Sequence, residues 1–95
     1  MICEKVIQIL EQQSPEHLAC DWDNVGLLIG SRKKEIKKIY IALDATEDVI
    51  DEAIAHGADM LITHHPLIFS GIKQVLEEDF IGRRVIKLVK ADIAY

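Results

Sequence analysis

The sequence of residues 39–66, IYIALDATEDVIDEAIAHGADMLITHHP, decides the fold. Its first five residues, 39–43, form a continuous apolar run of β-prone side chains, which is typical of a strand covered on both faces. Thr46 is placed to cap the helix that follows, and Gly57 can end that helix in the left-handed conformation. Residues 60–62 then form a second buried strand. This order predicts a parallel β-α-β unit.

Further elements are predicted on both sides of this unit. Apolar residues at helical spacing predict an N-terminal helix, after which Ser14 and Pro15 open a short second helix. Residues 27–29 are predicted to form a short strand, residues 77–90 a long helix, and residues 92–95 the start of a further strand. We therefore expect an α/β fold, a layered sandwich with a parallel β-α-β core and helices on the sheet faces.

The length and charge of the chain limit its class. A chain of 95 residues, of which 49% are hydrophobic, is long enough for one domain with one core, so we treat residues 1–95 as a single domain. The formal net charge of -5 argues against nucleic-acid binding, which requires clustered basic residues. The one basic cluster, Arg32 to Lys38, is interrupted by Glu35. Nucleic acid is therefore not expected as a partner.

Targeting signals and cysteine usage indicate a cytoplasmic protein. No apolar run approaches the roughly 20 residues needed to cross a bilayer, and the first residues lack the pattern of a signal peptide. The two cysteines, Cys3 and Cys20, have no CxxC spacing and are interpreted as reduced packing residues.

The candidate chemistry lies where the two predicted strands end. Asp44 follows the first strand, and His64 and His65 follow the second, at the edge where open α/β sheets bind ligands. Imidazole is the commonest metal ligand near neutral pH. Pro66 favours an extended conformation at His65, so the two rings are expected to diverge. Divergent rings would suit two ions about 3.5 to 4 Å apart, each bound by one histidine.

Each candidate also has a structural interpretation. The histidine pair can be hydrogen-bonded at the rim of a core, and Asp44 can brace a turn rather than act as a carboxylate beside the metals. His17 and His56 are interpreted as isolated surface or helix-end residues. The segment 22–24 (Trp22, Asp23, Asn24) is interpreted as a turn that buries the aromatic ring, with contact to a ligand as the alternative. A Gly-rich phosphate loop and a Gly-x-Ser-x-Gly motif are both missing from the sequence, which leaves metal-assisted chemistry.

Four segments taken together resemble the Nif-three-like family, whose members are often labelled GTP cyclohydrolase type 2 homologues. They are DNVGLLIG at 23–30, DAT at 44–46, the segment 52–59 and HHPLIF at 64–69, and the resemblance covers roughly residues 20–95. It implies a three-layer α/β fold of which this chain is the N-terminal part. It also implies two divalent metal ions with His64 and His65 among their ligands, and a homohexameric ring of full-length chains. The family's other ligands, an Asp, a His and a Glu, would lie beyond Tyr95, so this chain alone is expected to be inactive.

Three functional hypotheses remain open from the sequence. The first is a metal-dependent hydrolase acting on a small molecule such as a cyclic purine, with GTP cyclohydrolase as the named version. The second is a non-enzymatic metal-binding or scaffold protein that acts as an oligomer. The third is a phosphoesterase, which would need aspartates besides Asp44. The metal can be Zn, Fe, Ni, Co or Mn, because imidazole suits all of them. An exposed sheet edge and apolar face predict that this chain self-associates or pairs with another chain.

Overall fold

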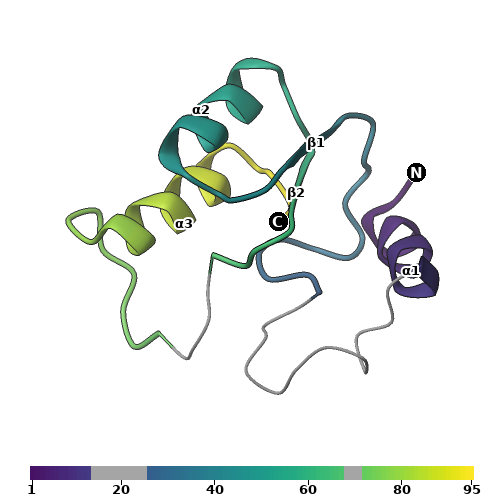
Figure 1. The fold of residues 1–95 in the computed structure, drawn as a ribbon, viewed down its shortest axis with the longest axis horizontal. Coiled ribbons are helices and arrows are strands. Elements are labelled where there is room, and N and C mark those ends of the chain that lie inside the picture. The colour runs from purple at the N-terminus through teal and green to yellow at the C-terminus, as the bar shows by residue number, and fades with distance from the viewer. Residues whose placement is uncertain (14–25, 68–71) are drawn as a thin grey trace.

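The computed structural model describes residues 1–13, 26–67 and 72–95. Its elements in chain order are α1 (Cys3–Gln13), β1 (Ile39–Ala42), α2 (Glu47–Ala55), β2 (Met60–Thr63) and α3 (Phe80–Lys90) (Figure 1). The short helix predicted from Ser14 and Pro15 lies outside the described residues, as do His17, Cys20 and the turn at 22–24.

The predicted β-α-β unit is confirmed. β1 and β2 pair in parallel, with Ile39 opposite Met60 and Ala42 opposite Thr63. Thr46 caps α2, because its hydroxyl accepts a hydrogen bond from the backbone N–H of Val49 at 3.2 Å. Gly57 follows the end of α2 with a φ of 68°, a left-handed conformation that glycine adopts without steric cost. Local capping signals therefore place this helix between the two strands.

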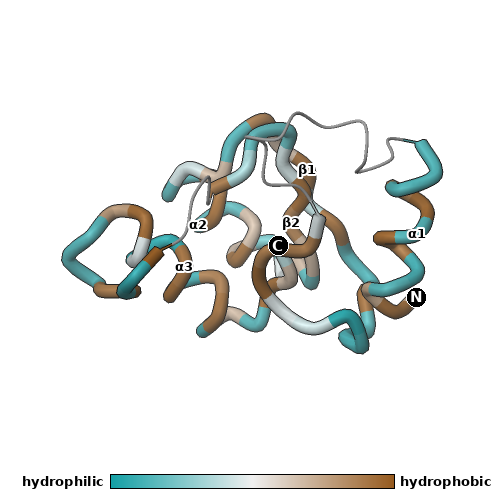
Figure 2. Tube along the Cα trace, turned by 90° about the horizontal axis from the view of Figure 1, so that it is seen from below, coloured by the Kyte–Doolittle hydropathy of each residue, from teal (hydrophilic) through white to brown (hydrophobic). Residues whose placement is uncertain are grey.

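The helices cover the strands from two sides. In Figure 1, α2 and α3 lie on one side of the strands and α1 on the other. Leu61 of β2 packs in a core cluster with Ile50 of α2 and Leu88 of α3, whereas Met60 packs against α1 in a second cluster. Neighbouring side chains of β2 thus serve opposite faces, as the alternation of a strand requires. In Figure 2 the strands are drawn brown, the colour of hydrophobic residues.

β1 differs from the prediction of a strand buried on both faces. Its residues on the α2 side are half-buried, but Ile41 is 73% exposed, and Ile39 and Leu43 on the same side are also exposed. The reason is the position of α1, which packs against β2 through Met60 and, at the edge of the cluster, Ile62. The part of the chain that the structure describes therefore leaves one face of β1 uncovered.

The predicted strand at residues 27–29 is wrong as a strand assignment. Gly26 and Gly30 flank the segment with φ values of 97° and 114°, so the chain turns at both ends. The segment still pairs locally, because the N–H groups of Leu28 and Ile29 donate to the Tyr95 carbonyl at 2.7 and 3.0 Å. Two glycine turns leave too little extended backbone for a strand.

The C-terminal predictions need two corrections. α3 begins at Phe80 rather than at residue 77, because Asp79 has extended backbone angles and its N–H closes a turn onto the carbonyl of Leu76. Residues 92–95 form a single parallel bridge, between Ala94 and Met60, rather than a strand. Asp92 has a φ of 55°, which interrupts extended backbone at the start of the segment.

Within residues 1–13, 26–67 and 72–95, no helix has both the length and the apolar character needed to cross a membrane.

Candidate metal site at the strand ends

The structure places Asp44, His64 and His65 together at the carboxyl ends of the two strands. The strand pairing continues past the last residues of the sheet, because the N–H of His64 donates to the Ala42 carbonyl at 3.3 Å and that of His65 to Leu43 at 3.0 Å. The histidines thus begin a loop whose backbone is still attached to β1. All three candidate side chains are exposed and available to a ligand.

The two imidazole rings lie side by side, contrary to the prediction that they diverge. Their centroids are 4.9 Å apart and their planes are inclined by 57°. The expectation assumed extended backbone, but the chain bends at His64 and His65 directly after β2. The hydroxyl of Thr63 stabilises this bend by donating to the His65 carbonyl at 2.7 Å. The rings therefore occupy neighbouring positions on the same surface.

Asp44 contacts His65 directly. Its Oδ1 lies 2.8 Å from Nδ1 of the imidazole, and the two side chains are 51% and 53% exposed. A carboxylate beside a candidate metal ligand orients the ring through the nitrogen that does not bind the ion. Residue spacing alone does not decide whether Asp44 braces a turn or acts beside a metal, but its contact with His65 places it next to a candidate ligand.

Thr63 and Tyr95 belong to the site although sequence reasoning did not include them. The Tyr95 hydroxyl lies 2.8 Å from that of Thr63 and 3.3 Å from the His65 carbonyl, and because Thr63 donates its own proton to that carbonyl, the one proton of Tyr95 is shared between these two acceptors. Burial raises the pKa of Tyr95 above its ordinary value, partly opposed by hydrogen bonds with Thr63 and the backbone of Leu67. The phenol therefore stays protonated and can donate. Thr63 could have been found as the last strand residue before the histidine pair, but Tyr95 carries no local signal.

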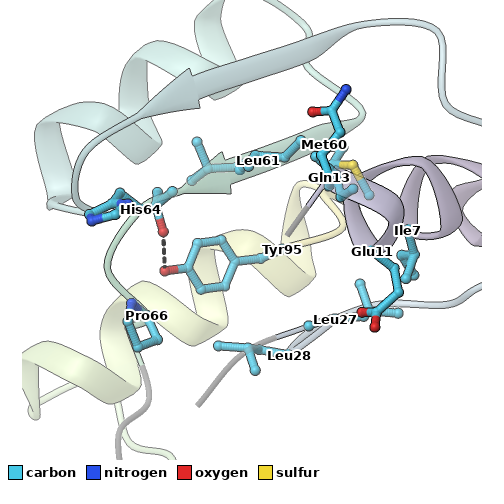
Figure 3. Close-up of a pocket in the computed structure, with 14 residues that line it drawn as sticks. Ile7, Glu11, Gln13, Leu27, Leu28, Met60, Leu61, His64, Pro66 and Tyr95 are labelled. Atoms are coloured by element: carbon cyan, nitrogen blue, oxygen red, sulfur yellow. Dashed lines mark hydrogen bonds between the residues drawn. The ribbon is translucent and has the colours of Figure 1, made fainter. Parts of the chain in front are cut away.

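A pocket of about 290 Å³ lies beside His64. In Figure 3, His64 stands at one end of the pocket and Ile7 and Glu11 of α1 at the other, with Tyr95 between them. A dashed line marks the hydrogen bond of the Tyr95 hydroxyl. Most of the walls are aliphatic, including Leu27, Leu28, Met60, Leu61 and Ile62. The site thus combines an exposed imidazole with a neighbouring apolar surface.

His56 has the structural role predicted for it. It ends α2 on the exposed surface, and its Nδ1 lies 2.8 Å from the carbonyl of Glu52 in the preceding turn. A carbonyl oxygen only accepts, so Nδ1 of this ring carries the proton. Its ring also contacts Tyr40, with 5.8 Å between centroids. His56 therefore serves as a helix-end residue, and it lies away from the strand ends.

The residues present fit part of a metal site. Two exposed imidazoles with a carboxylate on one of them have the donor chemistry of a divalent transition-metal ion. Among the described residues, however, there is no group of three or more His, Cys, Asp and Glu placed to hold an ion. A catalytic zinc site uses about three protein ligands. The described residues supply an incomplete ligand set.

Comparison with known proteins identifies relatives of this chain. The sequence model of the family described as Duf34/NIF3 (NGG1p interacting factor 3) matches residues 1–95. A GTP cyclohydrolase 1 type 2 homolog of Clostridium perfringens is 46% identical over 88 residues, which are 93% of this chain and 34% of that protein. The homolog of Bacillus subtilis is 43% identical over 91 residues, 96% of this chain and 24% of that protein. The chain thus spans only about a quarter to a third of the length of these relatives.

Solved structures show the same fold. A Bacillus cereus protein related to NIF3 aligns with a TM-score of 0.92 at 41% identity, over 99% of this chain and 26% of that one. Reduced HcgD from Methanocaldococcus jannaschii aligns with a TM-score of 0.90 at 38% identity, over 99% of this chain and 38% of that one. The resemblance drawn from the sequence motifs is confirmed.

Proposed function

Because this chain belongs to the Duf34/NIF3 family, we propose that it supplies His64 and His65 to a dinuclear site for divalent metal ions that hydrolyses a small molecule. The curated relatives are named GTP cyclohydrolase 1 type 2 homologs, which makes GTP the first substrate to test. The 95-residue chain by itself is proposed to be inactive, because its described residues form an incomplete ligand set.

The observation that carries this proposal is the pair of neighbouring exposed imidazoles at the end of β2. The ring centroids are 4.9 Å apart, so both imidazoles can donate to metal ions bound at this surface, and the number of two ions follows from the family resemblance. Two divalent ions, when bound, would supply Lewis-acid activation of water and stabilise developing negative charge. The protein's contribution is to hold the two rings in place through the bend at His64 and His65, and to orient one of them through Asp44.

The other parts of the proposal follow the family resemblance. We propose a cytoplasmic homohexamer of full-length chains, with further metal ligands from outside the described residues. The metal is one of Zn, Fe, Ni, Co or Mn, since imidazole binds each of them. The pocket beside His64 offers space for the apolar part of a substrate.

A non-enzymatic scaffold is the second candidate, because one face of β1 is apolar and exposed. Ile41 is 73% and Leu43 60% exposed on that face. Exposed apolar patches of this kind mark interaction surfaces. In this alternative the metals would brace an oligomer rather than act on a substrate.

The test is metal content by elemental analysis of the intact protein, purified without chelator. We expect about two divalent ions per chain, lost in the His64→Ala/His65→Ala double variant and retained in His56→Ala, a matched exposed histidine. Unmodified protein without metal, or a double variant that keeps it, would overturn the metal site. Full metal content without turnover of GTP or cyclic phosphoesters would favour the scaffold.

A further inference from the structure

Beyond the proposed metal site, the geometry points to a specific task for Asp44: we infer that it is a positioning residue that holds His65 in the Nδ1–H tautomer. In this state the ring presents the lone pair of Nε2 to a metal ion. The inference about metal binding rests on the proposed function. The inference about the tautomer rests on the contact between the two side chains alone.

The atoms in contact determine the direction of the hydrogen bond. Oδ1 of Asp44 lies 2.8 Å from Nδ1 of His65, a normal hydrogen-bond distance. An ionised carboxylate has no proton to give, so the imidazole nitrogen must donate. In a neutral ring with the proton on Nδ1, the other nitrogen is an acceptor and can coordinate a metal.

Both backbone polar groups of His65, its N–H and its carbonyl, are hydrogen-bonded. Its N–H donates to the Leu43 carbonyl at 3.0 Å, and its carbonyl accepts from Thr63 at 2.7 Å. Leu43 directly precedes Asp44, so the same segment after β1 anchors both the backbone and the ring. What remains free is rotation of the imidazole about its side-chain bonds, and the contact with Asp44 restricts that rotation.

His64 has no comparable partner. Its ring contacts the ring of His65, but the described part of the chain places no hydrogen-bonding group on its nitrogens. The inference therefore predicts asymmetry: loss of Asp44 should weaken the ion bound by His65 more than the ion bound by His64. Removal of a carboxylate partner from a metal-binding histidine costs about 10- to 100-fold in metal affinity.

The first readout is the tautomer of each histidine, measured by long-range proton–nitrogen correlation spectra of metal-free protein carrying isotope-labelled histidine. A His65→Gln variant assigns the His65 signal. His56 is an internal reference, because its Nδ1 donates to the Glu52 carbonyl at 2.8 Å. We expect the nitrogen shifts of His65 to match the Nδ1–H pattern of His56 in the unmodified protein. An Nε2–H pattern at His65 would overturn the inference without any substitution of Asp44.

The second readout compares Asp44→Ala with Asp48→Ala, which removes an exposed carboxylate at the start of α2. In Asp44→Ala we expect the Nδ1–H pattern to be lost at His65 and the affinity of one Co²⁺ site, followed by its visible absorption, to fall about 10- to 100-fold. Asp48→Ala should change neither. An unchanged tautomer and affinity in Asp44→Ala would overturn the role of Asp44. Failure of the unmodified full-length protein to bind Co²⁺ would instead overturn the proposed function, while the tautomer readout would still decide whether Asp44 sets the ring.

Discussion

The hydroxyl groups of Tyr95 and Thr63 lie 2.8 Å apart, although 32 positions separate them in the sequence. Both hydroxyls also bond the carbonyl of His65, at 3.3 Å from Tyr95 and 2.7 Å from Thr63. The bend that carries the two candidate metal ligands is therefore tied to Tyr95, a residue distant in the sequence. The stability of the bend at His64 and His65 should therefore depend on the hydroxyl groups of Thr63 and Tyr95, which are not candidate metal ligands.

The phenol of Tyr95 should support the histidine bend. Tyr95→Phe removes the hydroxyl but keeps the buried ring, so we expect a loss of about 1 kcal/mol in the free energy of unfolding and altered proton shifts at His64 and His65. The control is Tyr40→Phe, which removes an exposed hydroxyl that contacts Glu52. Equal effects of the two variants on the histidine shifts would contradict the role of Tyr95.

Asp59 should make stability depend on pH at the acidic end. Its carboxylate accepts the backbone N–H groups of Lys37 and Lys38 at 2.9 and 3.0 Å, and these bonds lower its pKa below the ordinary value. A lowered pKa in the folded state gives stability that is complete above the unfolded pKa of about 3.9 and is lost as pH falls through the lower folded value.

The test for Asp59 is urea unfolding at a series of pH values. Asp59→Asn should lose about 1 kcal/mol near neutral pH, a value reduced for partial solvent exposure, and its stability should fall less steeply than that of the unmodified protein below about pH 4. Asp48→Asn serves as the control for loss of a charge. If the free energy of unfolding falls equally steeply below about pH 4 in Asp59→Asn and in the unmodified protein, Asp59 is not the source of the pH dependence.

Gly82 in α3 should not tolerate a methyl group. A Cβ at this position would clash with the carbonyl oxygen of Leu76 and would lie 2.6 Å from its nitrogen. Overpacking of this kind costs about 1 to 3 kcal/mol, whereas Gly→Ala in an open helix position stabilises by about 1 kcal/mol. We therefore expect thermal unfolding to show a lower melting temperature for Gly82→Ala than for the unmodified protein. A higher melting temperature would mean that the turn at Leu76 moves to make room for the methyl group.

Two strand residues of similar size should lose very different amounts of stability on truncation. Leu61 is 1% exposed in the main core cluster, and Leu61→Ala should cost about 2 to 5 kcal/mol. Ile41 is 73% exposed on the neighbouring strand, and in dilute solution, where the chain is monomeric, Ile41→Ala should change stability by no more than about 0.5 kcal/mol. Chemical denaturation measures both. A large loss in Ile41→Ala would mean that a second chain covers this face.

Self-association of the 95-residue chain is expected through the uncovered face of β1. Ile39, Ile41 and Leu43 form an exposed apolar row on that face. Ile41→Lys places a charge in the row and should shift sedimentation toward the monomer, whereas Gln8→Lys on the exposed surface of α1 should not. A dispersed monomer of the unmodified chain at high concentration would argue against this surface.

The sequence by itself determined the β-α-β unit and the edge at which the site lies. The apolar runs of the two strands, the Thr46 cap and the turn at Gly57 are signals read over a few residues, and local backbone energetics decide them. The positions of Asp44 and His65 at the strand ends then follow from parallel pairing.

Only the tertiary structure decided how the site is arranged. The side-by-side rings, the bond between Asp44 and His65, and the support from Tyr95 could not be read from residue spacing. The late start of α3 and the open face of β1 were likewise missed. All of these depend on contacts between segments that are distant in the chain or on which helix covers which strand. Such contacts are set by packing in three dimensions, whereas periodicity and capping report only the local conformation of the backbone.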